Sequence, residues 1–121
     1  MAAVILHVDD SPSIRHWVTH VLSKPDVKVI SAVDGVDALN ILATTEVDLL
    51  LSDLEMPQVD GLELATAVRN FPQHKYLPIL ILSTRKAADF PAKMRETITG
   101  WVSKPVDAED LRRWVNRLLP G

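Results

Sequence analysis

Short apolar runs alternate along the whole chain with longer segments of helical periodicity. Each run is four to seven residues long, as expected for strands that are buried on both faces of a sheet. The five runs cover residues 4–8, 27–33, 47–52, 79–82 and 100–103. Between them, apolar side chains recur three or four residues apart, which predicts amphipathic helices. The pattern therefore predicts strand-and-helix units repeated from one end of the chain to the other.

Several of the predicted helices carry recognisable start signals. Ser11 is a typical N-cap residue, and Pro12 suits the first helical turn. Asp107 is expected to cap the last helix, with Asp110 in its first turn. The apolar stripe of that helix is Leu111, Trp114, Val115, Leu118 and Leu119. The fourth helix is poorly defined, because Pro91 stands in it and must either begin or interrupt it.

The alternation of strands and helices predicts an α/β fold with a doubly wound parallel sheet. Parallel strands need crossover connections, which place helices on both faces of the sheet. Right-handed crossovers leave only a few possible topologies. In such sheets ligands bind beyond the carboxyl ends of the strands, at the point where the strand order reverses. Functional residues are therefore expected just after the strands.

Composition narrows the class of protein. A chain of 121 residues with 47% hydrophobic residues suits one domain over residues 1–121, with no room for an effector domain. The net charge of −3 gives no indication of nucleic-acid binding. The chain has no cysteine, so it has neither a disulfide framework nor a thiolate zinc site. It shows no signal peptide and no apolar run long enough for a bilayer. We expect a soluble, cytoplasmic protein without a membrane or nucleic-acid partner.

Unusual polar residues stand at the ends of four predicted strands. Asp9 and Asp10 follow the first, Asp53 the third, Ser83 the fourth and Lys104 the fifth. Clustered carboxylates repel one another and need a compensating cation, and an all-oxygen site favours Mg²⁺ over zinc. A lysine and a hydroxyl suit phosphate oxygens, and an aspartate can act as a nucleophile toward phosphorus. These residue types together indicate phosphoryl transfer.

Four motifs carry a family resemblance. They are VDD at 8–10, SDLEMPQVDG at 52–61, LST at 82–84 and SKP at 103–105. In this order and spacing they resemble the receiver domains of bacterial two-component response regulators, over essentially the full chain. VDDSPSIR and GWVSKP are most similar to the single-domain chemotaxis-type receivers. The resemblance implies a five-stranded sheet with strand order 2-1-3-4-5.

The resemblance also implies a magnesium site and a phosphoacceptor. Asp53 would accept the phosphoryl group and share in holding Mg²⁺. Asp10 would contact the ion directly, whereas Asp9 would act mainly through metal-bound water. Glu55 would contribute its backbone carbonyl.

Further implied roles concern the response to phosphorylation. Ser83 would donate a hydrogen bond to the phosphoryl group and Lys104 would bridge it, with a cis peptide bond between Lys104 and Pro105. As Ser83 moves, an aromatic residue on the fifth strand would fill the vacated space. That residue is Trp101, where the family usually has Tyr or Phe. The larger indole leaves two expectations open, a rotamer change or a smaller repacking.

Three residues near the predicted site either depart from the family pattern or are expected to change the lifetime of the phosphorylated state. Thr84 replaces a small alanine and is expected to narrow access to Asp53. Glu55 and Arg85 occupy positions that flank the phosphoryl group. We expect them to pair across the site, hinder the attacking water and lengthen the phosphorylated state.

The implied function is a phosphorylation-dependent signalling switch rather than an enzyme with a separate substrate. Its expected partners are a sensor histidine kinase or phosphotransfer domain, and a target protein bound by the fourth helix, fifth strand and last helix. A monomer or weak dimer is expected. One alternative is a receiver-like binding module that no longer accepts phosphate. A second is a small phosphohydrolase, although that class usually has an aspartate where this chain has Glu55. A flavin carrier lacks support, because no Ser/Thr/Gly-rich phosphate loop follows the first strand.

Overall fold

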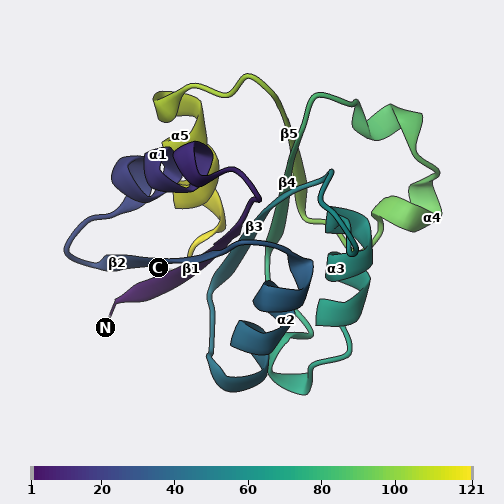
Figure 1. Ribbon diagram of the computed structural model, residues 1–121, viewed down its shortest axis with the longest axis horizontal. Helices are drawn as coiled ribbons and strands as arrows, with labels where there is room; N and C mark the ends of the chain where they lie inside the picture. The colour runs from purple at the N-terminus through teal and green to yellow at the C-terminus, as the bar shows by residue number, and fades with distance from the viewer. Residues whose placement is uncertain (1, 121) are drawn as a thin grey trace.

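The computed structural model describes residues 2–120 and contains a five-stranded, entirely parallel sheet (Figure 1). The spatial order of the strands is β2-β1-β3-β4-β5. This order confirms the predicted doubly wound topology, with its reversal between β1 and β3. The strands are β1 (Ala3–Val8), β2 (Val27–Ala32), β3 (Leu49–Asp53), β4 (Ile79–Ser83) and β5 (Gly100–Ser103).

Helices cover both faces of the sheet, as predicted. Figure 1 shows α1 and α5 together on one side of the sheet and α2 and α3 on the other, with α4 beyond β5. The helices are α1 (Pro12–Leu22), α2 (Gly35–Thr44), α3 (Gly61–Val68), α4 (Ala92–Arg95) and α5 (Ala108–Leu118), with 3₁₀ turns η1 (Pro72–His74) and η2 (Ala87–Asp89). Within residues 2–120, no helix has the length and apolar character needed to cross a membrane.

Two apolar clusters, one on each face, hold the sheet between its helices. Leu6 and Leu50 belong to the cluster under α2 and α3, whereas Ile5 and Leu51 belong to the cluster under α1 and α5. Strands β3 and β4 are buried at every residue. Central parallel strands require this, because side chains alternate between two faces that are both covered.

The third strand differs from its predicted range at both ends. It begins at Leu49 instead of residue 47, because side chains satisfy the backbone there. The Val4 N–H donates to an Asp48 carboxylate oxygen (2.8 Å), and the Val47 N–H donates to Nε2 of His74 (3.3 Å). Asp53 is the last residue of the strand and not the first of a loop. The phosphoacceptor candidate is therefore fixed by the sheet itself.

The predicted helix starts at Ser11 and Asp107 are confirmed. The Ser11 hydroxyl accepts from the Ile14 N–H (3.4 Å), and the Asp107 carboxylate accepts from the Asp110 N–H (2.8 Å). Pro91 begins the fourth helix, because it occupies the N-cap position of α4. The helix that follows has only four residues.

Residues 84–101, from the end of β4 into β5, form a stretch in which no side chain is buried. Arg69, which follows α3, ties this stretch to the sheet. Its guanidinium donates to the carbonyls of Thr97 (2.7 Å) and Leu77 (2.7 Å), with longer bonds to those of Lys75 (3.2 Å) and His74 (3.4 Å). One side chain thus joins the segment before β4 to the segment before β5.

Candidate functional site

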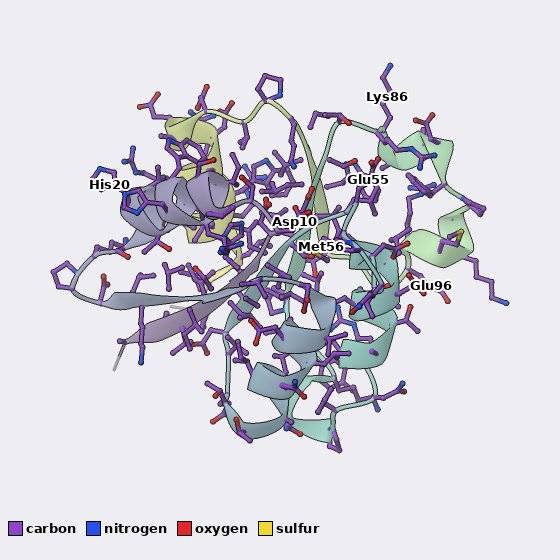
Figure 2. The ribbon with its side chains drawn as sticks, in the orientation of Figure 1. Asp10, His20, Glu55, Met56, Lys86 and Glu96 are labelled. Atoms are coloured by element: carbon purple, nitrogen blue, oxygen red, sulfur yellow. The ribbon has the colours of Figure 1, made fainter. Side chains whose placement is uncertain are left out.

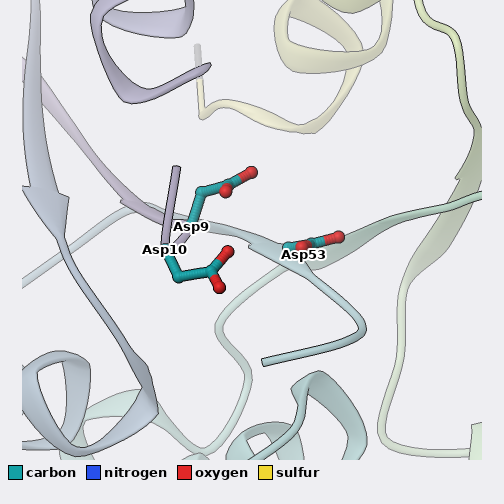
Figure 3. Close-up of side chains that lie close together, drawn as sticks. All are labelled: Asp9, Asp10 and Asp53. Atoms are coloured by element: carbon teal, nitrogen blue, oxygen red, sulfur yellow. The ribbon is translucent and has the colours of Figure 1, made fainter. Parts of the chain in front are cut away.

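Three carboxylates converge at the carboxyl ends of β1 and β3. The two strands are neighbours, with Val8 level with Ser52, so the residues that follow them meet at the same edge of the sheet. Carboxylate oxygens of Asp9, Asp10 and Asp53 lie within 4.8 Å of one another (Figure 3). This arrangement brings together the acidic residues that the strand ends predicted.

Two hydrogen bonds hold Asp9 in place, one to its side chain and one to its backbone carbonyl. One carboxylate oxygen accepts from the Ser11 N–H (2.9 Å), and its backbone carbonyl accepts from the Arg15 guanidinium (2.7 Å). Burial raises the pKa of Asp9, the bond from Ser11 lowers it, and the negative charge of Asp53 raises it. Its second carboxylate oxygen, Oδ2, is buried without a hydrogen-bond partner in the described chain. Such an oxygen needs a cation or a donor.

Lys104 supplies the positive charge of the site. Its Nζ lies 2.7 Å from Oδ1 of Asp53, and both side chains are largely shielded from solvent. The Lys104–Pro105 peptide bond is cis, as the resemblance implied. The second carboxylate oxygen of Asp53 is not part of this ion pair, so a nucleophilic oxygen remains beside the lysine.

Gly61, the first residue of α3, packs against the backbone that carries Asp53. A Cβ at this position would lie 2.7 Å from the Asp53 carbonyl oxygen and 3.1 Å from Cα of Leu54. The Gly61 N–H also donates to the Leu54 carbonyl (2.8 Å). Only glycine allows α3 to approach the end of β3 this closely.

His7 lies two residues before Asp9, in β1, and is completely buried. Burial, together with the positive charges of Arg15 and Lys104, lowers the pKa of His7 to about 4. The imidazole is therefore neutral at physiological pH. Neither ring nitrogen has a hydrogen-bond partner within residues 2–120. His7 is thus a core residue behind the acidic cluster.

Arg85 connects Ser83 to Trp101. The buried Ser83 hydroxyl accepts from the Arg85 N–H (2.9 Å), and the Trp101 indole N–H donates to the Arg85 carbonyl (2.8 Å). The Trp101 ring lies 5.4 Å from the ring of Phe90, and the Arg85 guanidinium stands 4.5 Å above that same ring. A single residue, Arg85, therefore links the predicted phosphoryl-sensing hydroxyl to the predicted aromatic switch.

Comparison with known proteins identifies the family. Residues 5–116 match the response regulator receiver domain. The chain belongs to this family. The PilG protein of Pseudomonas aeruginosa is 33% identical to the receiver over 97% of this chain and 87% of PilG. The cyclic di-GMP phosphodiesterase response regulator RpfG of Xanthomonas campestris is 35% identical, but the receiver spans only 31% of its length.

Solved structures agree with this assignment. The chemotaxis protein CheY4 of Vibrio cholerae is 36% identical to the receiver, with a TM-score of 0.91 over 98% of this chain and 100% of CheY4. The response regulator TrrA of Thermotoga maritima is 28% identical, with a TM-score of 0.85 over 97% of this chain and 99% of TrrA. The TrrA structure contains Mg²⁺ and BeF. The receiver is therefore a domain of two-component signalling that is similar to chemotaxis-type receivers.

The expected ion pair between Glu55 and Arg85 is absent. Within the described chain, ion pairs join only Lys104 to Asp53 and Arg113 to Asp110. The Arg85 guanidinium is instead engaged by the face of Phe90, which attracts cations. Glu55 is exposed in the loop after β3, and Figure 2 shows it and Asp10 in the loops that leave this edge of the sheet.

Thr84 is exposed and directly follows the last residue of β4. Together with Lys104, it lines a mainly apolar groove of about 640 Å³, whose other side includes Ile14 and Trp17 of α1. The expected narrowing of access to Asp53 by Thr84 stays a prediction.

The sequence does not predict the roles of two arginines, one beside the receiver's site and one at the opposite edge of the sheet. Arg15 is the last residue of the VDDSPSIR motif, for which the sequence predicts no role, yet its guanidinium donates to the Asp9 carbonyl. Its position in the first turns of a helix that follows an acidic loop is the one available signal. Arg69 binds backbone carbonyls alone, and carbonyls have no sequence signature.

Proposed function

We propose that the receiver is a phosphorylation-dependent switch in which Asp53 accepts a phosphoryl group. The observation that carries this proposal is the convergence of three carboxylates within 4.8 Å, one of them 2.7 Å from a lysine ammonium. Phosphoryl transfer depends on positioning and charge neutralisation more than on elaborate covalent chemistry. This edge of the sheet offers both.

The proposed donor is a phosphohistidine of a sensor histidine kinase or of a phosphotransfer domain. A carboxylate oxygen of Asp53 attacks phosphorus, the P–N bond breaks, and its electron pair stays on the imidazole nitrogen, which then takes up a proton. The product is an acyl phosphate on Asp53. Lys104 neutralises charge on the phosphoryl oxygens in this step, and water later hydrolyses the acyl phosphate without turnover of a separate substrate.

The carboxylate cluster fits Mg²⁺. An all-oxygen donor set with a buried, unpartnered Oδ2 on Asp9 matches the preference of this ion for oxygen ligands. Asp10 and Asp53 would hold the ion directly, Asp9 through water, and Glu55 through its carbonyl. When bound, Mg²⁺ supplies charge neutralisation to phosphate oxygens.

Phosphorylation is proposed to change the surface formed by α4, β5 and α5, where a target protein would bind. If the Ser83 hydroxyl turns toward the phosphoryl group, the Arg85 N–H loses its acceptor. Trp101 bonds to the same residue, so it would respond by changing its rotamer or by repacking. Phosphorylation would thus shift a population between two existing arrangements. The receiver is proposed to act as a monomer or weak dimer.

Intact-mass spectrometry tests the phosphoacceptor directly. The receiver is incubated with acetyl phosphate and Mg²⁺, beside Asp53→Asn and a magnesium-free sample. We expect one added phosphoryl group that both controls lack. Because a small donor can fail for kinetic reasons, Trp fluorescence is also followed during addition of beryllofluoride. If no phosphoryl group is added and beryllofluoride causes no change in Trp fluorescence, the proposal is refuted and a constitutive binding module is favoured.

Glu55 and Arg85 are proposed to tune the lifetime of the acyl phosphate separately, since they do not pair. The decay of phosphorylated receiver is measured for Glu55→Ala, for Arg85→Ala and for the double variant. Separate action predicts that the two changes in ln rate add. Unchanged decay in both single variants would remove the idea.

A further inference from the structure

A polar hollow lies at the opposite edge of the sheet from Asp53. It has a volume of about 240 Å³ and is enclosed by the end of α1, the start of β2 and the last turns of α5. Parallel strands and the helices that return along them place these segments at the amino-terminal edge. Figure 1 shows α1 and α5 adjacent, and Figure 2 shows His20 at the far end of α1.

The lining of this hollow is cationic above an apolar floor. Lys24 and Arg112 line it together with His20, and no carboxylate of residues 2–120 does. Asp26 lines a neighbouring hollow of about 220 Å³ but not this one. The floor includes the buried side chains of Val21, Leu22, Val27 and Val115. Cations without carboxylate partners above such a floor suit an amphiphilic anion.

Capping of α1 explains only part of this positive charge. Arg112 donates through Nε to the carbonyl of Val21 (3.3 Å), which is a favourable interaction at a helix C-terminus. The C-terminus of a helix carries only about half a negative charge. Lys24 and Arg112 bring two full positive charges, so an excess of more than one remains.

Arg112 is also oriented for an anion. Its Nε bond fixes the guanidinium, whereas Nη1 and Nη2 have no hydrogen-bond partner in the described chain. A guanidinium held in this way can bind two oxygens of a phosphate or carboxylate at once. Lys24 stands on a rigid support, because it exchanges two backbone hydrogen bonds with Val27 (3.4 and 2.9 Å).

We propose that this hollow binds a small organic oxyanion, a phosphate or carboxylate attached to a short apolar group. The oxyanion lies between Arg112 and Lys24, and the apolar group rests on Val21 and Val115. The site is separate from the phosphoacceptor and does not depend on the function proposed for Asp53.

Nuclear magnetic resonance titration of the isotope-labelled receiver tests this site. The probes are phenyl phosphate, benzoate and inorganic phosphate, and the signals are Nε–H of Arg112 and the side-chain amide of Asn116, which also lines the hollow. We expect saturable shifts with both aromatic anions. Inorganic phosphate is expected to bind at least threefold more weakly than phenyl phosphate, because it cannot use the apolar floor.

Arginine variants on the same helix decide the outcome. Arg112→Gln should weaken binding of phenyl phosphate at least tenfold. Arg113→Gln, which removes an equal charge from an exposed pair with Asp110, should change it less than twofold. Lys24→Gln provides a second test in case Arg112→Gln does not fold. The Lys24 ammonium has no hydrogen-bond or ion-pair partner within residues 2–120, so its removal should leave the fold intact and weaken binding severalfold. Equal effects of Arg112→Gln and Arg113→Gln, or shifts confined to the surroundings of Lys104, would overturn the proposal.

Discussion

Replacement of Arg69 by methionine should cost the receiver a large part of its stability. Methionine keeps an unbranched apolar stem but removes the guanidinium, which leaves the carbonyls of Leu77 and Thr97 without their 2.7 Å donors. A hydrogen bond to a charged group contributes about 1.5–3 kcal/mol. Arg69 is only partly buried, so the lower value applies to each of the two short bonds. The longer bonds share Nη1 with the bond to Leu77 and are not counted separately. The expected loss is about 3 kcal/mol.

Urea unfolding followed by Trp fluorescence measures this loss. With a urea dependence of about 2 kcal/mol per molar, the midpoint should fall by roughly 1.5 M, and the thermal midpoint should fall by about 10 °C. Arg113→Met is the matched control, because its ion pair with Asp110 is exposed and should be worth less than about 0.5 kcal/mol. Arg69→Lys should recover at most half the loss, since one ammonium cannot reach both carbonyls. Equal midpoints for Arg69→Met and Arg113→Met would refute the reasoning.

Three further substitutions test other parts of the structure. Burial lowers the pKa of His74, so below about pH 6.5 the unfolded chain takes up a proton there more readily than the folded protein does. The stability that His74 contributes is therefore fully present above about pH 6.5 and declines as the pH falls below that value. His74→Gln keeps an acceptor for the Val47 N–H, and its urea midpoints should fall less steeply below pH 6.5 than those of the unchanged receiver, with the contribution of His7 remaining. Parallel pH profiles would contradict the assignment. Gly61→Ala should destabilise the fold by about 1–3 kcal/mol, because its Cβ meets the Asp53 carbonyl; an unchanged urea midpoint would count against this. Lys104→Met should slow phosphorylation of Asp53 by acetyl phosphate at least tenfold in the mass assay, and a wild-type rate would exclude its proposed role.

The sequence predicted the sheet well because strand and helix periodicities differ so clearly. Fully apolar runs such as residues 79–82 are too short for a typical helix and therefore favour a buried strand. The clustering of the polar residues at the strand ends follows from the topology. Asp9, Asp10 and Asp53 could therefore be placed together before any coordinates were known. Their convergence is a property of neighbouring parallel strands and needs no side-chain detail.

The sequence did not allow specific contacts of side chains with the backbone or with aromatic rings to be predicted. The start of β3 was misplaced because Asp48 and His74 take over backbone bonding there. The predicted Glu55–Arg85 ion pair was wrong because the Phe90 ring attracts the guanidinium. The spacing of charged residues in a sequence does not indicate whether an aromatic ring competes for the same cation. Such local choices depend on distances that only folding determines.

The stretch from residue 84 to residue 101 has a consequence for hydrogen exchange and for evolution. None of its side chains is fully buried, and only Phe90, Ile98 and Trp101 pack against the core, so opening it exposes less apolar surface and costs less free energy than unfolding the sheet. Its amide hydrogens should exchange through local openings, whereas those of β3 and β4 should exchange only when the whole domain unfolds. Substitutions in this stretch can therefore change what docks on the receiver while the strands that hold the acidic cluster keep their stability.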